Sequence, residues 1–457
     1  MFIMEVFYVS DNIKKIKEDV VDFLNEDTVI NETWVEKNHP IDIAEALSEL
    51  EEEKVNSFTE LLNNRDLADI LEQSDEELQI DILKLKEIDE IIDILSHMAT
   101  DEITDILGNL TIKRRKKLLQ CMKQGEAKII KDFLGYDIES AGGIMTTEYI
   151  LLNKGLNTKQ ALDKIKEIGP DTEVIDTIFI MDNNKILVGA VDLRDILNSP
   201  DQVLLEEIMD DNIITVSPEM DQELVAHQVA KYNLTALPVV NKNNILLGII
   251  TVDDVIDVIE AENTEDMFRM VGVHEEESIN SPLLKSIQRR LPWLCINLGT
   301  AFLAAFTVGL FEDVIAQVVA LAAAMPIVAG MGGNAGTQTL SVVIRGIALG
   351  EVDSNRSWKL VLKEGFLGLI NGAVTGLLTG VILYMMYGNP YLGLIIFLAM
   401  ILNLLIAGLF GFLIPLGLKS IGVDPALASA IFVTTATDVF GFFVFLGLAK
   451  LFLEYLV

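Results

Sequence analysis

An apolar segment near the C-terminus carries a single carboxylate: Pro425-Ala-Leu-Ala-Ser-Ala-Ile-Phe-Val-Thr-Thr-Ala-Thr-Asp438-Val-Phe-Gly441. If the segment is a helix, Asp438 lies about 20 Å along it from Pro425, inside a bilayer core of roughly 30 Å. A charge at that depth costs at least about 2.5–3.5 kcal/mol, so we expect Asp438 to be functional and to face a cavity or a partner. The alternative is a protonated acid that pairs with a hydroxyl such as that of Thr437.

The segments before it are equally apolar and predict five membrane spans in a transmembrane domain of residues 286–457. Leu291–Phe311 and Val314–Ile344 are uncharged, and Gly365–Leu418 is uncharged but broken by a turn at residues 387–391. The last span is about Pro425–Leu448. Five spans place the termini on opposite sides, and a cytoplasmic N-terminus satisfies the positive-inside rule for Arg345, Arg356, Lys359, Lys363 and Lys419. We therefore expect a multi-pass protein of the cell (inner) membrane with cytoplasmic N-terminal domains.

The charge of the chain is concentrated outside these spans. Of 69 acidic and 34 basic residues, eight and six fall in residues 291–457, so residues 1–290 have a net charge of −33. This balance argues against nucleic acid and anionic lipid as partners and favours cations, although solubility alone is an alternative reason. The two cysteines and four histidines have no metal-site spacing. No nucleophile–base pair suggests an enzyme.

Residues 1–136 are helical by the spacing of their apolar residues. A short repeat occurs at residues 68–71, 92–95 and 104–107, each an Asp-Ile-Leu preceded by a small or apolar residue. This spacing predicts helices of about ten residues stacked as a small superhelix. Asp69, Asp101 and Asp105 are either a solvated helix face or a cation site; Asp101 and Asp105 share one face and repel each other unless something positive lies between them.

Residues 137–262 contain an internal duplication. Each half predicts a hairpin with an Asn-rich turn. The two segments are Ile178-Phe-Ile-Met-Asp-Asn-Asn-Lys-Ile-Leu-Val-Gly-Ala-Val-Asp-Leu-Arg-Asp195 and Leu237-Pro-Val-Val-Asn-Lys-Asn-Asn-Ile-Leu-Leu-Gly-Ile-Ile-Thr-Val-Asp-Asp254. The pair resembles tandem cystathionine-β-synthase (CBS) domains. Such domains are regulatory and often bind adenosine nucleotides such as ATP; the resemblance places Arg194 and Asp195 where a ribose or phosphate is held. The alternative is a CBS pair that only senses cations or dimerises.

An acidic segment, residues 253–285, connects the duplication to the first span and predicts an amphipathic helix. Its acids crowd one short element: Asp254, Asp257, Glu262, Glu265 and Asp266. Like charges at helical spacing are mutually destabilising, and divalent cations that prefer oxygen ligands would reverse this. The alternative is an acidic linker repelled by lipid headgroups.

The second predicted span contains Gly330-Met-Gly-Gly-Asn334-Ala-Gly-Thr-Gln338, shortly after Pro326. Glycines at this density allow helices to approach closely, and with the proline they can loosen the helix so that carbonyls face a pore. Packing alone is an equal explanation for the glycines. It is a weaker one for Asn334 and Gln338, because a buried amide needs partners.

The whole chain resembles the MgtE family of magnesium channels in the order of its parts. The motifs Gly332-Gly-Asn334-Ala-Gly-Thr-Gln338, Gly422-Val-Asp-Pro-Ala-Leu-Ala428 and Thr434-Thr-Ala-Thr-Asp438-Val carry the resemblance. It implies a multi-domain fold with a helical superhelix, an α/β CBS pair and an all-α transmembrane domain of five helices. It also implies a homodimer with a pore on its two-fold axis, in which Asp438 is the selectivity residue and Gly330, Asn334 and Thr434 surround it.

The resemblance further implies gating by cytosolic Mg²⁺. Ions shared among acidic elements close the pore, and the matching positions are Asp69, Asp101, Asp105, Gly143, Glu223, Asp254, Asp257, Glu262, Glu265 and Asp266. Asn233 departs from the pattern, since an acid is expected there. Two other functions stay open: an ion-coupled secondary transporter of divalent cations such as Co²⁺ or Mn²⁺, and a CBS-controlled membrane sensor without transport.

Overall fold

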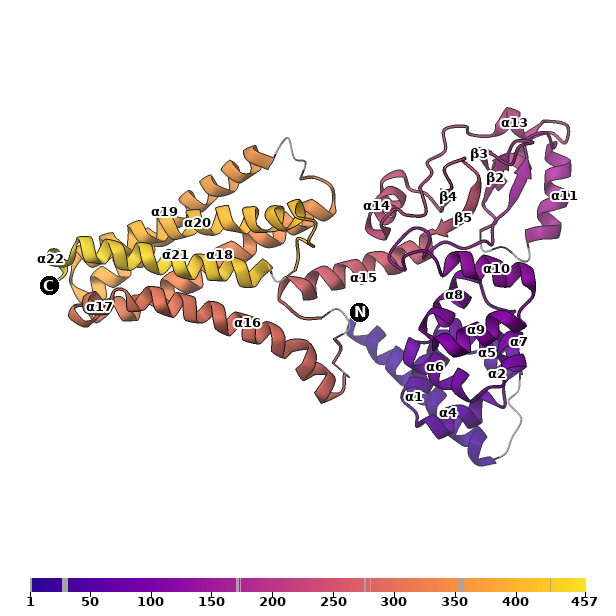
Figure 1. The fold of residues 1–457 in the computed structure, drawn as a ribbon, viewed down its shortest axis with the longest axis horizontal. Helices are drawn as coiled ribbons and strands as arrows, with labels where there is room; N and C mark the ends of the chain where they lie inside the picture. The colour runs from indigo at the N-terminus through magenta and orange to yellow at the C-terminus, as the bar shows by residue number, and fades with distance from the viewer. Residues whose placement is uncertain are drawn as a thin grey trace. The chain divides into compact units, whose positions relative to one another are not determined.

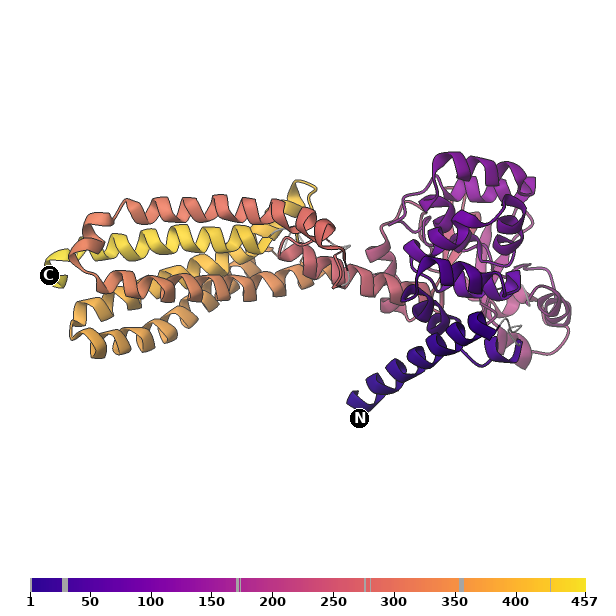
Figure 2. The same cartoon turned by 90° about the horizontal axis from the view of Figure 1, so that it is seen from below.

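The computed structural model describes residues 2–26, 32–169, 172, 174–274, 277–279, 281–352, 357–427 and 429–457. Arg356 and Ala428, named above, lie outside the described residues. The chain forms two compact units, Met1–Val258 and Ile259–Val457. Figure 1 shows the order of their elements, and Figure 2 shows the same chain from below.

The first unit begins with short helices that repeat as predicted. The repeat acids Asp69, Asp93 and Asp105 are exposed, and the Ile-Leu pair after each is buried in one core. Each helix therefore contributes one apolar stripe to that core. The helices are α1 (Phe2–Glu26), α2 (Glu32–Val35), α3 (Pro40–Ser48), α4 (Glu52–Thr59), α5 (Asn64–Glu72), α6 (Glu76–Leu85), α7 (Ile88–Leu95), α8 (Thr100–Asn109), α9 (Ile112–Cys121) and α10 (Gln124–Phe133).

Two arginines of the basic helix α9 fix the ends of neighbouring helices. Arg114 donates to carbonyls at the end of α6, including that of Lys84 at 3.0 Å. Arg115 donates to the Leu107 carbonyl at 2.6 Å and to that of Gly108, at the end of α8. The last carbonyls of a helix lack partners within it, so these guanidinium groups complete both helices. Arg115 thereby holds α8, which carries Asp101 and Asp105.

The duplication is confirmed in the next part of the first unit. Its elements are β1 (Leu151–Asn153), α11 (Thr158–Ile168), β2 (Thr177–Met181), β3 (Leu187–Asp192), α12 (Leu193–Asn198), α13 (Leu205–Ile208), α14 (Gln222–Tyr232), β4 (Ala236–Val240) and β5 (Leu246–Thr251). β2 pairs antiparallel with β3 and β4 with β5, as the Asn-rich turns predicted. Each turn has the same form: Asp182 and Asn241 accept backbone hydrogen bonds, and Lys185 and Asn244 adopt φ values of 65° and 58°.

The acidic connecting helix is shorter than the predicted segment 253–285. It is α15 (Val252–Met270), and the next helix begins at Leu283. Gly272 stops it with φ +74° while the Val273 N–H donates to the Phe268 carbonyl at 2.9 Å. This is the glycine-terminated helix end that only a residue free to adopt positive φ accommodates well.

The second unit continues with long apolar helices: α16 (Leu283–Gly309), α17 (Glu312–Gln317), α18 (Ala320–Ala348), α19 (Ser357–Tyr387), α20 (Pro390–Ser420), α21 (Ser429–Leu451) and α22 (Leu453–Leu456). Among the described residues, α16, α19, α20 and α21 are long and apolar enough to span a membrane. α18 is 29 residues long and is not among these four helices; its apolar residues are interrupted by glycines, Asn334 and Gln338. The count of five spans therefore stays a prediction.

Glycines bring α19 and α20 together, as Figure 1 shows for the paired helices. Gly368, Gly372, Gly376 and Gly380 recur every four residues on one face of α19. A Cβ at any of them would lie 2.3–2.8 Å from the α20 backbone. Because real Cβ atoms do not approach so closely, these glycines fix the spacing of the two helices.

Candidate ion pathway and acidic clusters

Asp438 is half-buried on α21. Three nearby threonine hydroxyls donate to carbonyls of their own helix: Thr434 to Ala430 at 2.9 Å, Thr435 to Ile431 at 2.6 Å, and Thr437 to Thr434 at 3.0 Å. A hydroxyl has one proton to donate. The Thr437 proton is therefore used within the helix, which weakens the alternative of a structural Thr437–Asp438 pair.

A polar stripe on α18 accompanies this carboxylate. Gly330, Asn334 and Gln338 are four residues apart, so they share one helix face, and all three are exposed in the chain. A Cβ at Gly330 would meet no atom of the described residues within 4 Å. At Gly333 a Cβ would lie 3.6 Å from Thr434 Cγ2, which shows that α18 and α21 pack together beside Asn334.

This exposure argues against packing within the chain as the reason for Asn334 and Gln338, which was the weaker of the two explanations from the sequence. Amides facing hydrocarbon are unfavourable, so a membrane helix presents such a face to water, to a partner or to a cavity. A helix face can be covered by a second copy of the chain or by another helix of the same chain. A single sequence shows the same pattern in both cases.

In the first unit, carboxylates of α8 approach the start of α15. Burial and, after it, the charge of Asp254 raise the pKa of Asp101 to about 7. Burial and, after it, the charge of Asp101 raise the pKa of Glu102 to about 8. Asp101 Oδ1 is buried and has no hydrogen-bond partner among the described residues. Asp254 accepts from Thr251 Oγ1 at 2.6 Å, which holds its carboxylate in place.

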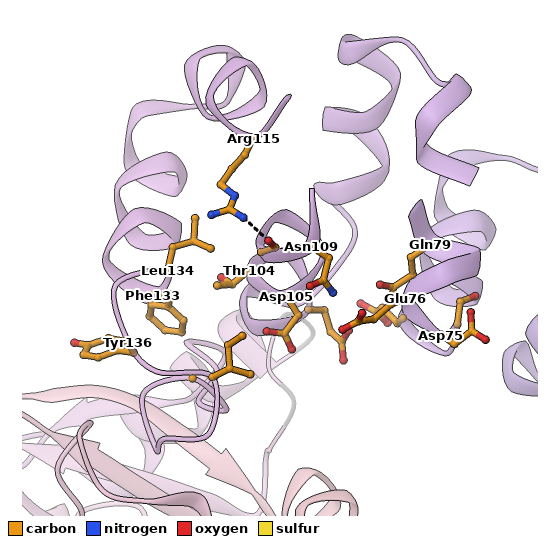
Figure 3. Close-up of a pocket in the computed structure, with 16 residues that line it drawn as sticks. Asp75, Glu76, Gln79, Thr104, Asp105, Asn109, Arg115, Phe133, Leu134 and Tyr136 are labelled. Atoms are coloured by element: carbon orange, nitrogen blue, oxygen red, sulfur yellow. Dashed lines mark hydrogen bonds between the residues drawn. The ribbon is translucent and has the colours of Figure 1, made fainter. Parts of the chain in front are cut away.

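A cavity of about 630 Å³ lies beside this cluster. Its lining includes Asp105 and Gly143, which were both predicted as site residues, together with Glu72, Glu76 and Glu102. Figure 3 shows Asp105 of α8 and Glu76 of α6 on neighbouring helices of the cavity wall. A Cβ at Gly143 would lie 2.4 Å from the Asp137 carbonyl oxygen, so a glycine is required for this tight turn. The cavity is therefore lined by several carboxylates, and the tight turn at Gly143 forms part of its wall.

Other predicted residues of the first unit lie at the margin of this cluster or outside the cavity. Asp69 is exposed. Burial raises the pKa of Glu72, a hydrogen bond from the Ala99 N–H lowers it, and the charge of Asp69 raises it. Asp257 is exposed, and Glu223 lies on α14 and does not line the cavity. The described part of the chain contains no group of three or more His, Cys, Asp or Glu side chains that could hold a metal ion.

In the second unit the C-terminal half of α15 forms a separate acidic cluster. Burial and, after it, the charges of Asp424 and Glu262 raise the pKa of Asp266 to about 6, although Arg269 and Arg345 lower it. Arg269 forms ion pairs with Glu265 and, at 2.8 Å, with Asp424. From the sequence, Asp424 was noted only within the motif of residues 422–428 and was not predicted as a site residue. Its Oδ1 accepts from the Ala426 N–H at 2.8 Å, as is typical of an aspartate in a turn.

The same half of α15 packs on α18 and α21. Met270 contacts a cluster of Leu340, Ile344, Ala426 and Val433. Arg345 of α18 donates to Asn263 at 3.3 Å. The C-terminal half of α15 thus contacts the segment around Asp424 and both α18 and α21.

A cleft of about 450 Å³ lies between the two halves of the duplication. Asp195 lines it, whereas Arg194 does not and is exposed. Asn233 also lines the cleft, and it ends α14 in the left-handed conformation with φ 52°. Asparagine tolerates this conformation well, which gives a local backbone reason for the residue found where an acid was expected.

Family models match three parts of the chain. The MgtE intracellular N domain model matches residues 38–139, and the CBS domain model matches residues 141–201 and 205–261. A model described as a divalent cation transporter, MgtE, matches residues 325–448.

Similar proteins cover most of the chain. The magnesium transporter MgtE of Enterococcus faecalis (strain ATCC 700802 / V583) is 36% identical over 73% of this chain and 73% of its own length. That of Bacillus subtilis (strain 168) is 33% identical over 74% of each chain. A crystal structure of the soluble part of a magnesium transporter covers 55% of this chain and 99% of its own, with 30% identity and a TM-score of 0.51. These alignments confirm the resemblance, and the chain belongs to the MgtE family.

Proposed function

We propose that the protein is a Mg²⁺-selective channel that takes up magnesium across the cell membrane as a homodimer. The observation that carries the proposal is the exposed polar stripe of α18 beside Asp438 of α21. A second copy that covers this face around a water-filled path removes the cost of exposing amides to lipid. The names of the relatives, which are magnesium transporters, support magnesium as the ion.

The chemistry of the stripe suits a hydrated Mg²⁺ ion, which keeps several of its waters. Two Asp438 carboxylates, one from each copy, favour a divalent over a monovalent charge. Asn334 and the carbonyls near Gly330 accept hydrogen bonds from the waters of the ion. Thr434 adds hydroxyl lone pairs, because its proton is already donated to its own helix.

Asp438→Ala tests the pore. In vesicles containing the full chain, we expect Mg²⁺ flux to fall by roughly 100-fold or more, because a charge within a site of low dielectric dominates ion stabilisation. Asp313→Asn removes an exposed acid of α17 and is the matched control. Unchanged flux in Asp438→Ala would remove Asp438 from the pathway.

We further propose that cytosolic Mg²⁺ closes the channel through the two acidic clusters. Burial first, and then the charges of neighbouring carboxylates, raise the pKa values of Asp101 and Asp254, and Asp101 Oδ1 lacks a partner among the described residues. Ions that bind the compact arrangement shift the population towards it. The proposed ligands in the first unit are Asp69, Asp101, Asp105, Gly143, Glu223, Asp254 and Asp257, and in the second unit Glu262, Glu265 and Asp266.

Patch-clamp recording with varied cytosolic Mg²⁺ tests conduction and gating together. We expect current at low Mg²⁺ and closure at high Mg²⁺. Asp101→Asn should leave the open current intact and require more Mg²⁺ for closure. Flux that follows an imposed proton gradient instead of the Mg²⁺ gradient and voltage would favour the coupled transporter.

The cleft of the duplication is the proposed nucleotide site. Its size and its position between two similar halves suit a nucleoside, and Asp195 is placed to accept from ribose hydroxyls. Several aspartates line the cleft, so we expect ATP to bind as its Mg²⁺ complex. A thermal shift of the full chain with MgATP, lost in Asp195→Ala, is the test; no shift in the unaltered protein would contradict it.

A further inference from the structure

Asn403 is a buried amide in the middle of the apolar helix α20. It has no exposed surface, and its Nδ2 donates to the Val328 carbonyl of α18 at 2.8 Å. Its Oδ1 is buried and has no hydrogen-bond partner among the described residues. The orientation is fixed by chemistry, since the reversed amide would place an oxygen against the carbonyl oxygen of Val328.

This arrangement is costly compared with the leucines on either side, Leu402 and Leu404. A buried polar atom without a partner is destabilising, and an apolar side chain of similar size would avoid that cost. Where a residue opposes local stability in this way, a functional reason is the usual one. The position of the amide gives that reason.

The amide group lies in a notch made by two glycines on different helices. A Cβ at Gly332 of α18 would be 2.5 Å from Asn403 Nδ2, and a Cβ at Gly441 of α21 would be 2.6 Å from Asn403 Oδ1. Neither position accepts a larger residue while the amide stays in place. Asn403 is therefore in direct contact with both helices that border the polar stripe.

The two glycines lie close in sequence to the groups proposed to handle the ion. Gly332 is two residues before Asn334, and Gly441 is three residues after Asp438. At about 1.5 Å per residue, the contacts of the amide lie within roughly 3–5 Å of the levels of Asn334 and Asp438 along their helices. A shift of either helix past the other would break the hydrogen bond to Val328 or close the notch.

We propose that Asn403 is a positioning residue that sets the register of α18 against α21 and so aligns Asn334 with Asp438. The alignment itself follows from contacts within the chain, and its consequence for ion passage rests on the proposed channel function. Asn403 does not touch the ion path in this arrangement, so it acts through the two helices.

Cysteine cross-linking measures the register without any transport assay. Gly333→Cys and Thr434→Cys form the reporter pair, because a Cβ at Gly333 lies 3.6 Å from Thr434 Cγ2, close enough for a disulfide. The full chain carries Cys121→Ser and Cys295→Ser to remove the native thiols. We expect cross-linking to slow in Asn403→Leu and to be unchanged in Asn371→Leu, a matched amide on the exposed face of α19.

Ion flux in vesicles measures the consequence. We expect Mg²⁺ flux per folded molecule to fall by roughly 10–100-fold in Asn403→Leu, the usual effect of losing an orienting contact, with a reduced preference for Mg²⁺ over monovalent cations. Asn403→Asp, nearly the same size, keeps the test readable if the leucine variant does not fold. Unchanged cross-linking together with unchanged flux and selectivity would overturn the proposal. Absence of Mg²⁺ flux in the unaltered protein would refute the channel function and leave the cross-linking result interpretable.

Discussion

Two helix faces of the second unit, one on α19 and one on α18, use glycine for opposite purposes. On α19 the glycines at 368, 372, 376 and 380 contact the backbone of α20. On α18 Gly330 faces open space, next to the exposed amides of Asn334 and Gln338. The spacing of glycines in a sequence therefore does not distinguish a helix face that packs closely on another helix from a polar face that stays exposed in the chain.

The neighbours of the two helices differ in the same way. The pair α19 and α20 is joined by apolar surface and close backbone contact. The pair α18 and α21 has polar contacts with α15: Arg269 of α15 binds Asp424 just before α21, and Arg345 of α18 donates to Asn263 of α15. We therefore expect the arrangement of α18 and α21 to respond to charge more than that of α19 and α20.

The largest expected difference is in stability. Gly372→Ala should lower the free energy of unfolding by about 1–3 kcal/mol, because its Cβ would lie 2.6 Å from Ile401 Cα and the helices must separate. Gly330→Ala should change it by less than about 0.5 kcal/mol, because the new methyl group meets open space. Denaturant unfolding of the full chain in detergent measures both, and equal losses would show that the two faces do not differ.

The next effect is on the response to Mg²⁺. Asp424→Asn removes one of the acids around Asp266 and breaks the ion pair of Asp424 with Arg269. We expect the cytosolic Mg²⁺ concentration for half-closure to rise by roughly tenfold, equivalent to about 1.4 kcal/mol of lost ion binding. Asp313→Asn is the control for general charge loss. A response equal to that of the unaltered protein would place the ion elsewhere.

Sequence reasoning predicted the parts that have local signals. The hairpins followed from Asn-rich turns, and the helical repeat followed from buried Ile-Leu pairs after exposed acids. The end of α15 was placed too late, because Gly272 was not recognised as a helix terminator. Asp101, Asp105 and Gly143 were named through family resemblance, and the structure brings the last two to one cavity.

The residues that were missed depend on contacts between distant segments. Asp424 was quoted only as part of a family motif, and only folding places it beside Asp266, which is 158 positions away in the chain. Asn403 was a single polar residue in an apolar span, and its importance comes from Gly332 and Gly441 on two other helices. The residue pattern of one segment does not predict contacts with residues that are distant in the sequence.

The smallest expected effect is a pH dependence of the α15 contact with α18 and α21. The pKa of Asp266 is about 6 in this arrangement and 3.8 ordinarily, so the packed helix binds the proton more tightly than the released one. The packed arrangement is therefore favoured at low pH and loses stability as the pH rises from about 4 to about 6. The proposed Mg²⁺ ion would act in the same direction as the proton, since either would reduce the repulsion of Asp266 by Asp424 and Glu262.

Hydrogen exchange of residues 259–270 in the full chain, without Mg²⁺, measures this effect. We expect greater protection at about pH 5 than at about pH 7, after correction for the intrinsic exchange rate, by roughly threefold to tenfold for a partly buried acid. Asp266→Asn should be protected equally at both values, because its amide does not titrate. The apolar contact between α19 and α20 contains no such group at its glycine stripe, so its protection should not change with pH. A pH response of equal size in both helix pairs would show that it comes from the membrane unit as a whole and not from the charges of α15.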